Sequence, residues 1–419
     1  MGNLLNPIDR RSFLGGTFCG VAAATGSSLL WRLGETHAAE VATFDTLFLT
    51  WQRDPTTTMT VQWIGNPTTK AESVIRYSEL NAEQWISVLP LQRPFPKTTL
   101  GVHRAEMTKL SPGTEYKFQI GAVPRLHRFR TMPAKATNEF QFISGGDCGV
   151  NEHVIANNII AAKQDPMFAL IGGDLAYDDG KHANTCLEFI RNYSRHMIDG
   201  QGRLIPMVVC IGNHDVRGHY NCERKDGPFF FALYDGLFAD RTFATLDFGD
   251  YLSLVLLDTG HVAPVAGEQT DWLESNLKAR ADCPHLIVAN HVPAYPSYRS
   301  ADDETEKAST GKANRKYWVP LFERHNVNIV LEHHDHTFKR TRPLLNGHVD
   351  SRGIIYLGDG SWGRQRVPQT PEQRDYLEIT EQQYHLTLHR LEGAKAFHMA
   401  LSEYGKVMDV CTSSKRAAA

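Results

Sequence analysis

Residues Phe168–Tyr177 read FALIGGDLAY, a short apolar run followed at once by Gly173-Asp174-Leu175-Ala176-Tyr177. A short apolar run of this kind predicts a buried strand, and the polar residues that follow it include groups that bind metal ions. The same arrangement recurs at five further places in the chain. The apolar runs there are residues 140–144, 207–211, 286–289, 329–331 and 354–357.

The segments at the ends of these runs are rich in Asp, Asn and His. They are Asp147-Cys148-Gly149, Gly212-Asn213-His214-Asp215, Val288-Ala289-Asn290-His291, His334-Asp335-His336 and Gly358-Asp359-Gly360. In open α/β sheets, ligands gather at the carboxyl ends of the strands. The six segments are therefore predicted to converge on one site, although they are far apart in sequence.

The strands alternate with helical stretches over residues 139–410, which predicts an α/β domain. Residues 268–280 have the apolar spacing of a helix that covers a sheet. Residues 243–247 and 251–257 are joined by Phe248-Gly249-Asp250 and predict a hairpin. Because a hairpin adds an antiparallel pair, the sheet should be mixed.

Residues 42–132 hold none of these segments and read as short strands separated by turns, which predicts a β-sandwich. The stretch Leu110–Tyr116, LSPGTEY, resembles the turn and tyrosine corner of a fibronectin type III module, with Trp63 as the core aromatic residue. We expect a scaffolding domain here, joined by a linker over residues 133–138.

Composition excludes two classes of partner. The 419 residues carry 44 Lys plus Arg against 47 Asp plus Glu, a net charge of −3, so there is no electrostatic case for nucleic acid or an anionic membrane. Hydrophobic residues make up 42% of the chain, as in an ordinary globular protein. A small-molecule or peptide-sized substrate is the remaining expectation.

The N-terminus resembles a twin-arginine export signal. Asp9-Arg10-Arg11-Ser12-Phe13-Leu14 opens a weakly apolar stretch that runs to about Trp31, and cleavage is plausible after Ala38. The alternatives are a chance Arg pair before a buried helix and an uncleaved membrane anchor. A signal over residues 1–38 implies contact with the twin-arginine machinery, a periplasmic or extracellular location, and no stable membrane insertion once it is removed.

Seven cysteines, or six after removal of Cys19 with the signal, permit disulfides in an exported protein. Their spacing matches no zinc finger. Cys186 and Cys222 are the predicted pair, because both lie in long loops near the site. Cys148 is expected to pack as a small hydrophobic residue.

Hard cations prefer carboxylates, and imidazole and amide ligands suit borderline divalent ions, so such a set predicts a site for iron, zinc or manganese. The candidate ligands are Asp147, Asp174, Asn213, His291, His334 and His336. Two-metal sites use a carboxylate to bridge ions that clamp attacking and leaving oxygens. Asp174, at a strand end, is the candidate bridge.

With these residues assembled, the chain resembles the metallophosphoesterase superfamily, and within it the purple acid phosphatases with their pattern DxG, GDxxY, GNH(D/E), VxxH and GHxH. The resemblance implies two mixed β-sheets flanked by helices, behind a fibronectin III-like sandwich. It also implies Fe³⁺ bound by Asp147, Tyr177 and His336, with Asp174 as the bridge. The divalent ion, Zn²⁺, Fe²⁺ or Mn²⁺, would be bound by Asn213, His291 and His334. His333 replaces the leading Gly of the last motif, which puts the local loop geometry in question.

Hydrolysis of phosphate monoesters by metal-bound hydroxide is the expected reaction, since Lewis-acidic ions lower the pKa of water. His214 is the candidate to contact phosphate or the leaving oxygen, with Asp215 orienting its imidazole. Relatives in the family carry a further His about ten residues after the VxxH ligand, where this chain has Ser300 and Ala301. Arg299 and Arg364 are candidate phosphate clamps.

Two other functions stay open at this point. A phosphodiesterase on the same scaffold is favoured if the missing His means that the site accepts a larger ester. A non-catalytic phosphate-binding protein is the third reading, although the complete set of seven candidate ligands argues against it.

Overall fold

The computed structural model describes residues 44–136, 139–301 and 306–414. The predicted export signal at residues 1–38 lies outside these ranges. Within them, no helix combines the length and the apolar character needed to cross a membrane.

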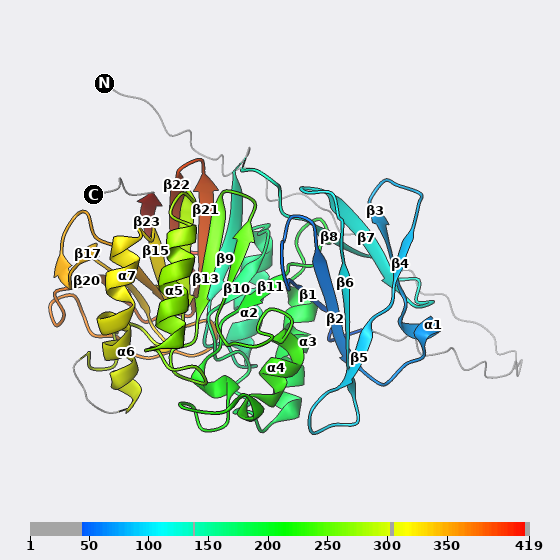
Figure 1. The fold of residues 1–419 in the computed structure, drawn as a ribbon, viewed down its shortest axis with the longest axis horizontal. Helices are drawn as coiled ribbons and strands as arrows, with labels where there is room; N and C mark the ends of the chain where they lie inside the picture. The colour runs from blue at the N-terminus through cyan, green and yellow to red at the C-terminus, as the bar shows by residue number, and fades with distance from the viewer. Residues whose placement is uncertain (1–43, 137–138, 302–305, 415–419) are drawn as a thin grey trace, which may run out of the picture. The chain divides into compact units, whose positions relative to one another are not determined.

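The N-terminal part is an all-β sandwich of two four-stranded antiparallel sheets (Figure 1). The first sheet has the order β1-β2-β6-β5, with bounds Phe48–Thr50, Met59–Gly65, Gly101–Met107 and Leu91–Pro94. The second has the order β4-β3-β7-β8, with bounds Ile86–Val88, Ile75–Glu79, Glu115–Ile120 and His127–Arg130. A short helix, α1 (Lys70–Ser73), precedes β3.

Two sequence predictions for this sandwich are confirmed by side-chain contacts. Trp63 is 2% exposed and stacks on His103 with ring centroids 4.7 Å apart. The Tyr116 hydroxyl accepts a hydrogen bond from the Ser111 backbone N–H at 2.8 Å, which is the contact that defines a tyrosine corner. The sandwich core therefore forms as the LSPGTEY stretch predicted.

The following α/β part contains two mixed sheets, as expected. The six-stranded sheet has the order β11-β10-β9-β21-β22-β23, with bounds Met207–Val209, Ala169–Ile171, Phe140–Gly145, His385–Glu392, Lys395–Ser402 and Val407–Ser414. The seven-stranded sheet has the order β12-β13-β14-β15-β19-β16-β20, with bounds Ala244–Phe248, Leu252–Leu257, His285–Asn290, Ile329–Glu332, Ile355–Asp359, Phe338–Thr341 and Leu377–Glu381. A small hairpin pairs β17 (Leu344–Leu345) with β18 (His348–Val349).

Six α-helices and two 3₁₀ turns are described in the α/β part. The α-helices are α2 (Glu152–Lys163), α3 (Ala183–His196), α4 (Pro228–Tyr234), α5 (Glu268–Ala279), α6 (Glu306–Tyr317) and α7 (Val319–Arg324), and short 3₁₀ turns cover Asn213–Asp215 and Arg224–Asp226. All six apolar runs of the sequence form strands, and the predicted hairpin is the antiparallel β12/β13 pair.

The continuous apolar runs are explained by burial of both faces of a sheet. Along β13, Leu254 and Leu256 belong to the large core that also holds residues of the six-stranded sheet. Val255 and Leu257, one residue out of phase, pack in a second core with Leu273 and its neighbours from α5. Since successive strand side chains point to opposite faces, a strand covered on both sides must be apolar at every position.

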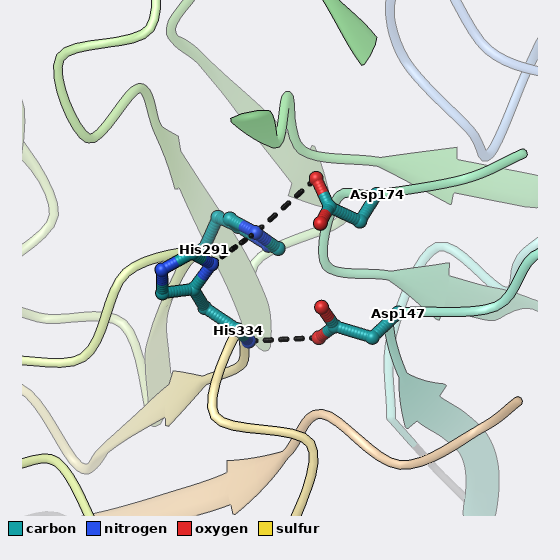
Figure 2. A group of neighbouring side chains, drawn as sticks. All are labelled: Asp147, Asp174, His291 and His334. Atoms are coloured by element: carbon teal, nitrogen blue, oxygen red, sulfur yellow. Dashed lines mark hydrogen bonds and ion pairs between the residues drawn. The ribbon is translucent and has the colours of Figure 1, made fainter. Parts of the chain in front are cut away.

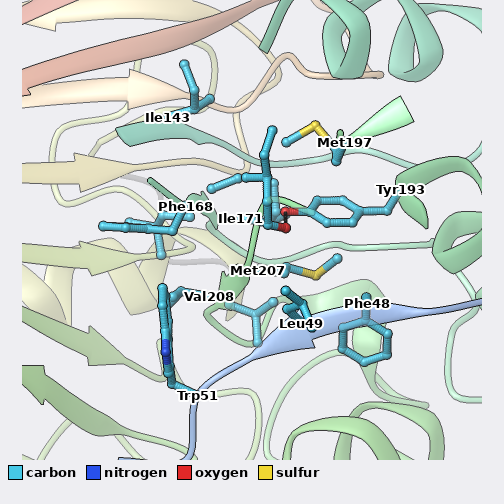
Figure 3. Close-up of a cluster of buried hydrophobic side chains, with 14 of the residues drawn as sticks. Phe48, Leu49, Trp51, Ile143, Phe168, Ile171, Tyr193, Met197, Met207 and Val208 are labelled. Carbon is cyan, nitrogen blue, oxygen red and sulfur yellow. Dashed lines mark hydrogen bonds between the residues drawn. The ribbon is translucent and has the colours of Figure 1, made fainter. Parts of the chain in front are cut away.

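The large core also joins the sandwich to the α/β part. Figure 3 shows Phe48 and Leu49 of β1, and Trp51 directly after that strand, beside Met207 and Val208 of β11. Trp51 meets Phe168 edge to face, with ring centroids 6.0 Å apart. Strand β1 is therefore part of the support beneath the strands that carry the site.

The predicted Cys186–Cys222 disulfide is wrong. Neither Cys186 nor Cys222 forms a disulfide within the described residues. Cys186 lies on α3 with 4% exposure, inside the apolar core, whereas Cys222 is half-buried in a loop and contacts the Arg217 and Tyr220 carbonyl oxygens. The prediction assumed that Cys186 lies in a loop. It lies instead on the face of α3 that packs into the core.

Candidate metal centre

Parallel register brings the candidate ligands to one edge of each sheet. Ile171 of β10 pairs with Gly145 of β9 and Val209 of β11, so these three strands end together. In the other sheet, Asn290 of β14 pairs with Glu332 of β15. The loops that leave these ends carry the candidate ligands Asp147, Asp174, Tyr177, Asn213, His291, His334 and His336. The structure places all seven on loops that leave these strand ends.

The first group of donor atoms comes from three of these residues. The Tyr177 hydroxyl lies 3.1 Å from Asp147 Oδ1 and 2.9 Å from His336 Nε2. His336 Nε2 lies 3.0 Å from Asp147 Oδ1, so the three atoms form a nearly equilateral triangle. Asp147 and Tyr177 distinguish this group from the second one, because a carboxylate and a deprotonated phenol would supply anionic oxygen to a hard ion.

The second group contains Asn213, His291 and His334. His291 Nε2 lies 3.1 Å from Asn213 Oδ1 and 3.1 Å from His334 Nδ1. Two nitrogens bound to one tetrahedral Zn²⁺ at about 2.0–2.1 Å would lie about 3.3 Å apart. The spacing of the two imidazoles therefore fits one shared ion.

Asp174 lies between the two groups. Its Oδ1 is 3.3 Å from His291 Nε2, whereas its Oδ2 is buried and has no hydrogen-bond partner. Figure 2 shows the carboxylates of Asp174 and Asp147 facing the imidazoles of His291 and His334, and donor atoms of all four lie within 4.8 Å of one another. A buried carboxylate oxygen without a partner is costly unless a cation meets it. The donor set therefore fits a binuclear metal centre.

Backbone strain concentrates at the same residues. Five of the seven candidate ligands have a positive φ, namely Asp147 (56°), Asp174 (53°), Tyr177 (61°), His334 (69°) and His336 (60°). Non-glycine residues adopt this region rarely and at a cost, so clusters of such residues mark functional sites. Neighbouring Gly212 is required sterically, because a Cβ there would come within 2.3 Å of the Asp174 backbone nitrogen.

Burial and charge act against each other on the two central groups. Burial disfavours the carboxylate of Asp174, but the His291 imidazole and the His214 backbone N–H outweigh it and hold the pKa of Asp174 below its usual range. Burial likewise disfavours charge on His291, while Asp174 and Asp147 outweigh it and raise the pKa of His291 to about 9. The carboxylate of Asp174 is therefore ionised at neutral pH, as a ligand of a cation must be.

His214 borders the site with its side chain 31% exposed, and its ring lies 4.5 Å from the Tyr177 ring. Its Nδ1 lies 2.6 Å from Asp179 Oδ1. The prediction that Asp215 orients His214 is wrong. Asp215 is buried and its carboxylate accepts hydrogen bonds from the backbone N–H groups of Asp174, Leu175 and Gly212 at 2.8–3.0 Å. Adjacent residues on a turn point apart, so Asp215 instead holds the two loops together.

Asp179 is the residue that sequence reasoning missed. It follows Tyr177 by two positions, and its backbone N–H donates to the His214 carbonyl oxygen at 3.0 Å. With His219 it also forms a second group of close donor atoms around His214. The pair Asp178-Asp179 directly after a metal motif was the available signal.

The unexpected His333 is accommodated without loss of the loop. It is 2% exposed, and its Nδ1 lies 2.9 Å from the Asn290 carbonyl oxygen. The His333 ring occupies space beside Gly172, where a Cβ would come within 1.9 Å of the ring. The absence of a side chain at Gly172, at the end of a neighbouring strand, therefore makes room for His333.

The two candidate phosphate clamps differ. Arg299 Nη1 donates to the His334 carbonyl oxygen and to Asp335 Oδ1, both at 2.8 Å. These bonds hold the guanidinium against the loop that carries His334. Arg364 is exposed, and its guanidinium carbon lies 4.2 Å from the Tyr177 ring centroid. Arg364 is thus the one of the two that the solvent side of the site can reach.

Comparison with known proteins agrees with this arrangement. Residues 45–142 match the family model for the purple acid phosphatase N-terminal domain, and residues 145–338 match the calcineurin-like phosphoesterase model. Purple acid phosphatase 21 of Arabidopsis thaliana is 24% identical over 64% of this chain, which spans 62% of that relative. Human acid phosphatase type 7 is 26% identical, over 74% of this chain and 76% of the relative.

Two solved structures share the fold. The yellow lupin purple acid phosphatase PPD1 has a TM-score of 0.72 at 15% identity, with 88% of this chain and 74% of that chain covered. The structure of PhoD has a TM-score of 0.64 at 12% identity, with 89% and 90% covered. On the two family models, residues 45–142 are a purple acid phosphatase N-terminal domain and residues 145–338 a calcineurin-like phosphoesterase domain, so the chain is a purple acid phosphatase-like metallophosphoesterase.

Proposed function

We propose that this protein is an exported acid phosphatase that hydrolyses phosphate monoesters at a mixed-metal centre. The observation that carries the proposal is the division of the ligands into two groups with Asp174 between them. Asp147, Tyr177 and His336 would hold Fe³⁺, and Asn213, His291 and His334 would hold Zn²⁺, Fe²⁺ or Mn²⁺. When bound, such ions supply the Lewis acidity that lowers the pKa of water and neutralises phosphate charge.

The residues around this centre have separable roles in the proposed reaction. Asp179 holds His214 Nδ1, which fixes the ring and leaves Nε2 to contact a phosphate or leaving-group oxygen. Arg364 would bind a second phosphate oxygen from the exposed side. Asp215 organises the backbone of the Asp174 loop.

The proposed export rests on Arg10-Arg11 and the stretch that follows, which resemble a twin-arginine signal. A folded, metal-loaded enzyme is the kind of cargo that this route suits. Replacement of both arginines by lysine should retain the protein in the cytoplasm. Secretion that continues unchanged would reject this part of the proposal.

The ratio of hydrolysis rates for an aryl phosphate monoester and the matching diester tests the reaction. Asp174→Asn, prepared in parallel, sets the background rate. We expect the monoester to be cleaved faster. A ratio well below one would assign a phosphodiesterase, and rates equal to the Asp174→Asn background for both esters would favour a phosphate-binding protein.

The iron assignment has its own test. A phenolate bound to Fe³⁺ absorbs visible light, so the loaded protein should be coloured and Tyr177→Phe should lose the band. Tyr298→Phe, at an exposed tyrosine in a neighbouring loop, is the matched control and should keep it. A band that survives Tyr177→Phe would remove Tyr177 from the ligand set.

A further inference from the structure

The second nitrogen of His334 points away from the metal centre and meets a tyrosine. His334 Nδ1 faces His291 Nε2 at 3.1 Å, so its Nε2 is on the opposite side of the ring. There it lies 3.3 Å from the Tyr220 hydroxyl. Metal-binding imidazoles commonly donate their second N–H to a protein acceptor, which fixes both the tautomer and the ring orientation.

We infer that Tyr220 is a positioning residue for His334, with its phenol oxygen accepting the Nε2–H and so directing the Nδ1 lone pair toward the divalent ion. This inference rests on the proposed metal centre. Tyr220 would act through His334 rather than on the substrate. It should therefore affect the divalent ion selectively, because the three ligands of the proposed Fe³⁺ group do not contact Tyr220 in the hydrogen bonds of the described residues.

The loop that carries Tyr220 is anchored to a second loop. The Asn221 N–H donates to the Gly260 carbonyl oxygen at 2.9 Å, and the Cys222 N–H donates to the His261 carbonyl oxygen at 2.8 Å. His261 is fully buried, and its Nδ1 lies 2.9 Å from the His219 carbonyl oxygen. The residues on both sides of Tyr220 are thus held by the same neighbour.

The second loop is itself well ordered by one carboxylate. Asp258 is fully buried and accepts hydrogen bonds from the backbone N–H groups of His261, Val262 and Ala263 at 2.7–3.0 Å. A contact built on two braced loops holds its geometry better than a side chain on a free loop. The Tyr220–His334 pair therefore has the rigidity that a ligand-positioning contact requires.

Metal retention by the full-length, metal-loaded protein tests the inference. Wild type, Tyr220→Phe and the control Tyr298→Phe would be titrated with a chromogenic chelator, and zinc and iron contents measured by elemental analysis. We expect Tyr220→Phe to bind Zn²⁺ roughly 10-fold more weakly, with iron retained, since loss of such a partner typically costs about 10–100-fold. Tyr298→Phe should match wild type.

The outcomes separate this inference from the proposed function. Equal Zn²⁺ affinity in wild type and Tyr220→Phe would overturn the positioning role and leave the metal centre intact. Parallel loss of zinc and iron in Tyr220→Phe would also overturn it, because that pattern reports a general loosening of the site. Failure of the wild-type protein to hold two metal ions would overturn both proposals.

Discussion

Two clusters of buried histidines lie in the α/β part of this protein and differ in how their polar atoms are satisfied. In the C-terminal strands, His389 Nε2 meets Ser144 Oγ at 2.7 Å and His389 Nδ1 meets His398 Nδ1 at 2.7 Å. His398 Nε2 then meets Ser413 Oγ at 2.8 Å. None of these four residues has a positive φ, and all lie on paired strands.

The cluster at the strand ends has the opposite character. Asp147, Asp174 and His334 lie in loops with a left-handed backbone, and Asp174 Oδ2 is buried without a partner. A chain of alternating donors and acceptors on strands stabilises a fold. Converging ligand atoms on strained loops instead reduce stability unless a cation completes them. Burial of histidine alone therefore does not indicate a functional site. Ligand atoms that converge and lack hydrogen-bond partners do indicate one.

Asp174→Asn should show the largest effect, and this effect should fall on activity rather than on stability. We expect kcat to fall by roughly 10³-fold, because the central charge of the donor set is lost. The thermal midpoint of the metal-free protein should change little, because the loss of the ion pair with His291 and the removal of a buried carboxylate oxygen without a partner oppose each other. Asp250→Asn, on an exposed turn, is the control. Activity within tenfold of wild type would show that the strand-end cluster is not needed for the reaction.

His389→Leu should show the reverse pattern. It removes the contacts of His389 with Ser144 and His398, so the free energy of unfolding should fall by about 2–3 kcal/mol while activity per folded molecule is kept. Denaturant unfolding and active-site titration would measure both. His348→Leu, at an exposed position, should change neither. A fully stable His389→Leu protein would show that the strand cluster is dispensable.

A further buried imidazole, that of His127 in the sandwich, extends the comparison to the pH dependence of stability. Burial, with help from the charge of Arg125, lowers the pKa of His127 to about 4. His127 therefore binds a proton less readily in the folded state than in the unfolded chain. The stability that comes from burying the neutral ring is complete above about pH 6.5 and is lost as the pH falls toward 4. The loss should reach about 3 kcal/mol.

His127→Phe keeps an aromatic ring beside Phe118, which His127 stacks on at 5.1 Å, and removes the titration. Denaturant unfolding between pH 4 and pH 7 should then depend less on pH than in wild type by that amount. Identical pH profiles for the two proteins would contradict the assignment.

Asp179→Asn should have the smallest effect of the set. Loss of the carboxylate that holds His214 should lower kcat by about tenfold, with metal content unchanged, as for other residues that orient a working group. Asp240→Asn, which is exposed, is the control. A change in metal content rather than in kcat would place Asp179 in the metal centre instead.

Much of the site was predictable because it depends on strand ends. Apolar runs predict buried strands, and parallel register then brings the residues after each run to one edge, so His291 and His334 could be placed together without a structure. The partner of His214 was not predictable in this way. Whether Asp179 or Asp215 faces the ring depends on the φ and ψ of a turn, which neighbouring residues in sequence do not reveal.

Periodicity and motif spacing are local properties, so the residues alone predicted the succession of strands and motifs, the sandwich with its tyrosine corner and six of the candidate ligands. The seventh, Tyr177, came from the resemblance to purple acid phosphatases. Only the tertiary structure decided that Cys186 and Cys222 stay apart, that Asp215 holds backbone rather than His214, and that Tyr220 meets His334. Those contacts join loops that are distant in sequence, and the packing of the sheets beneath them sets their distances.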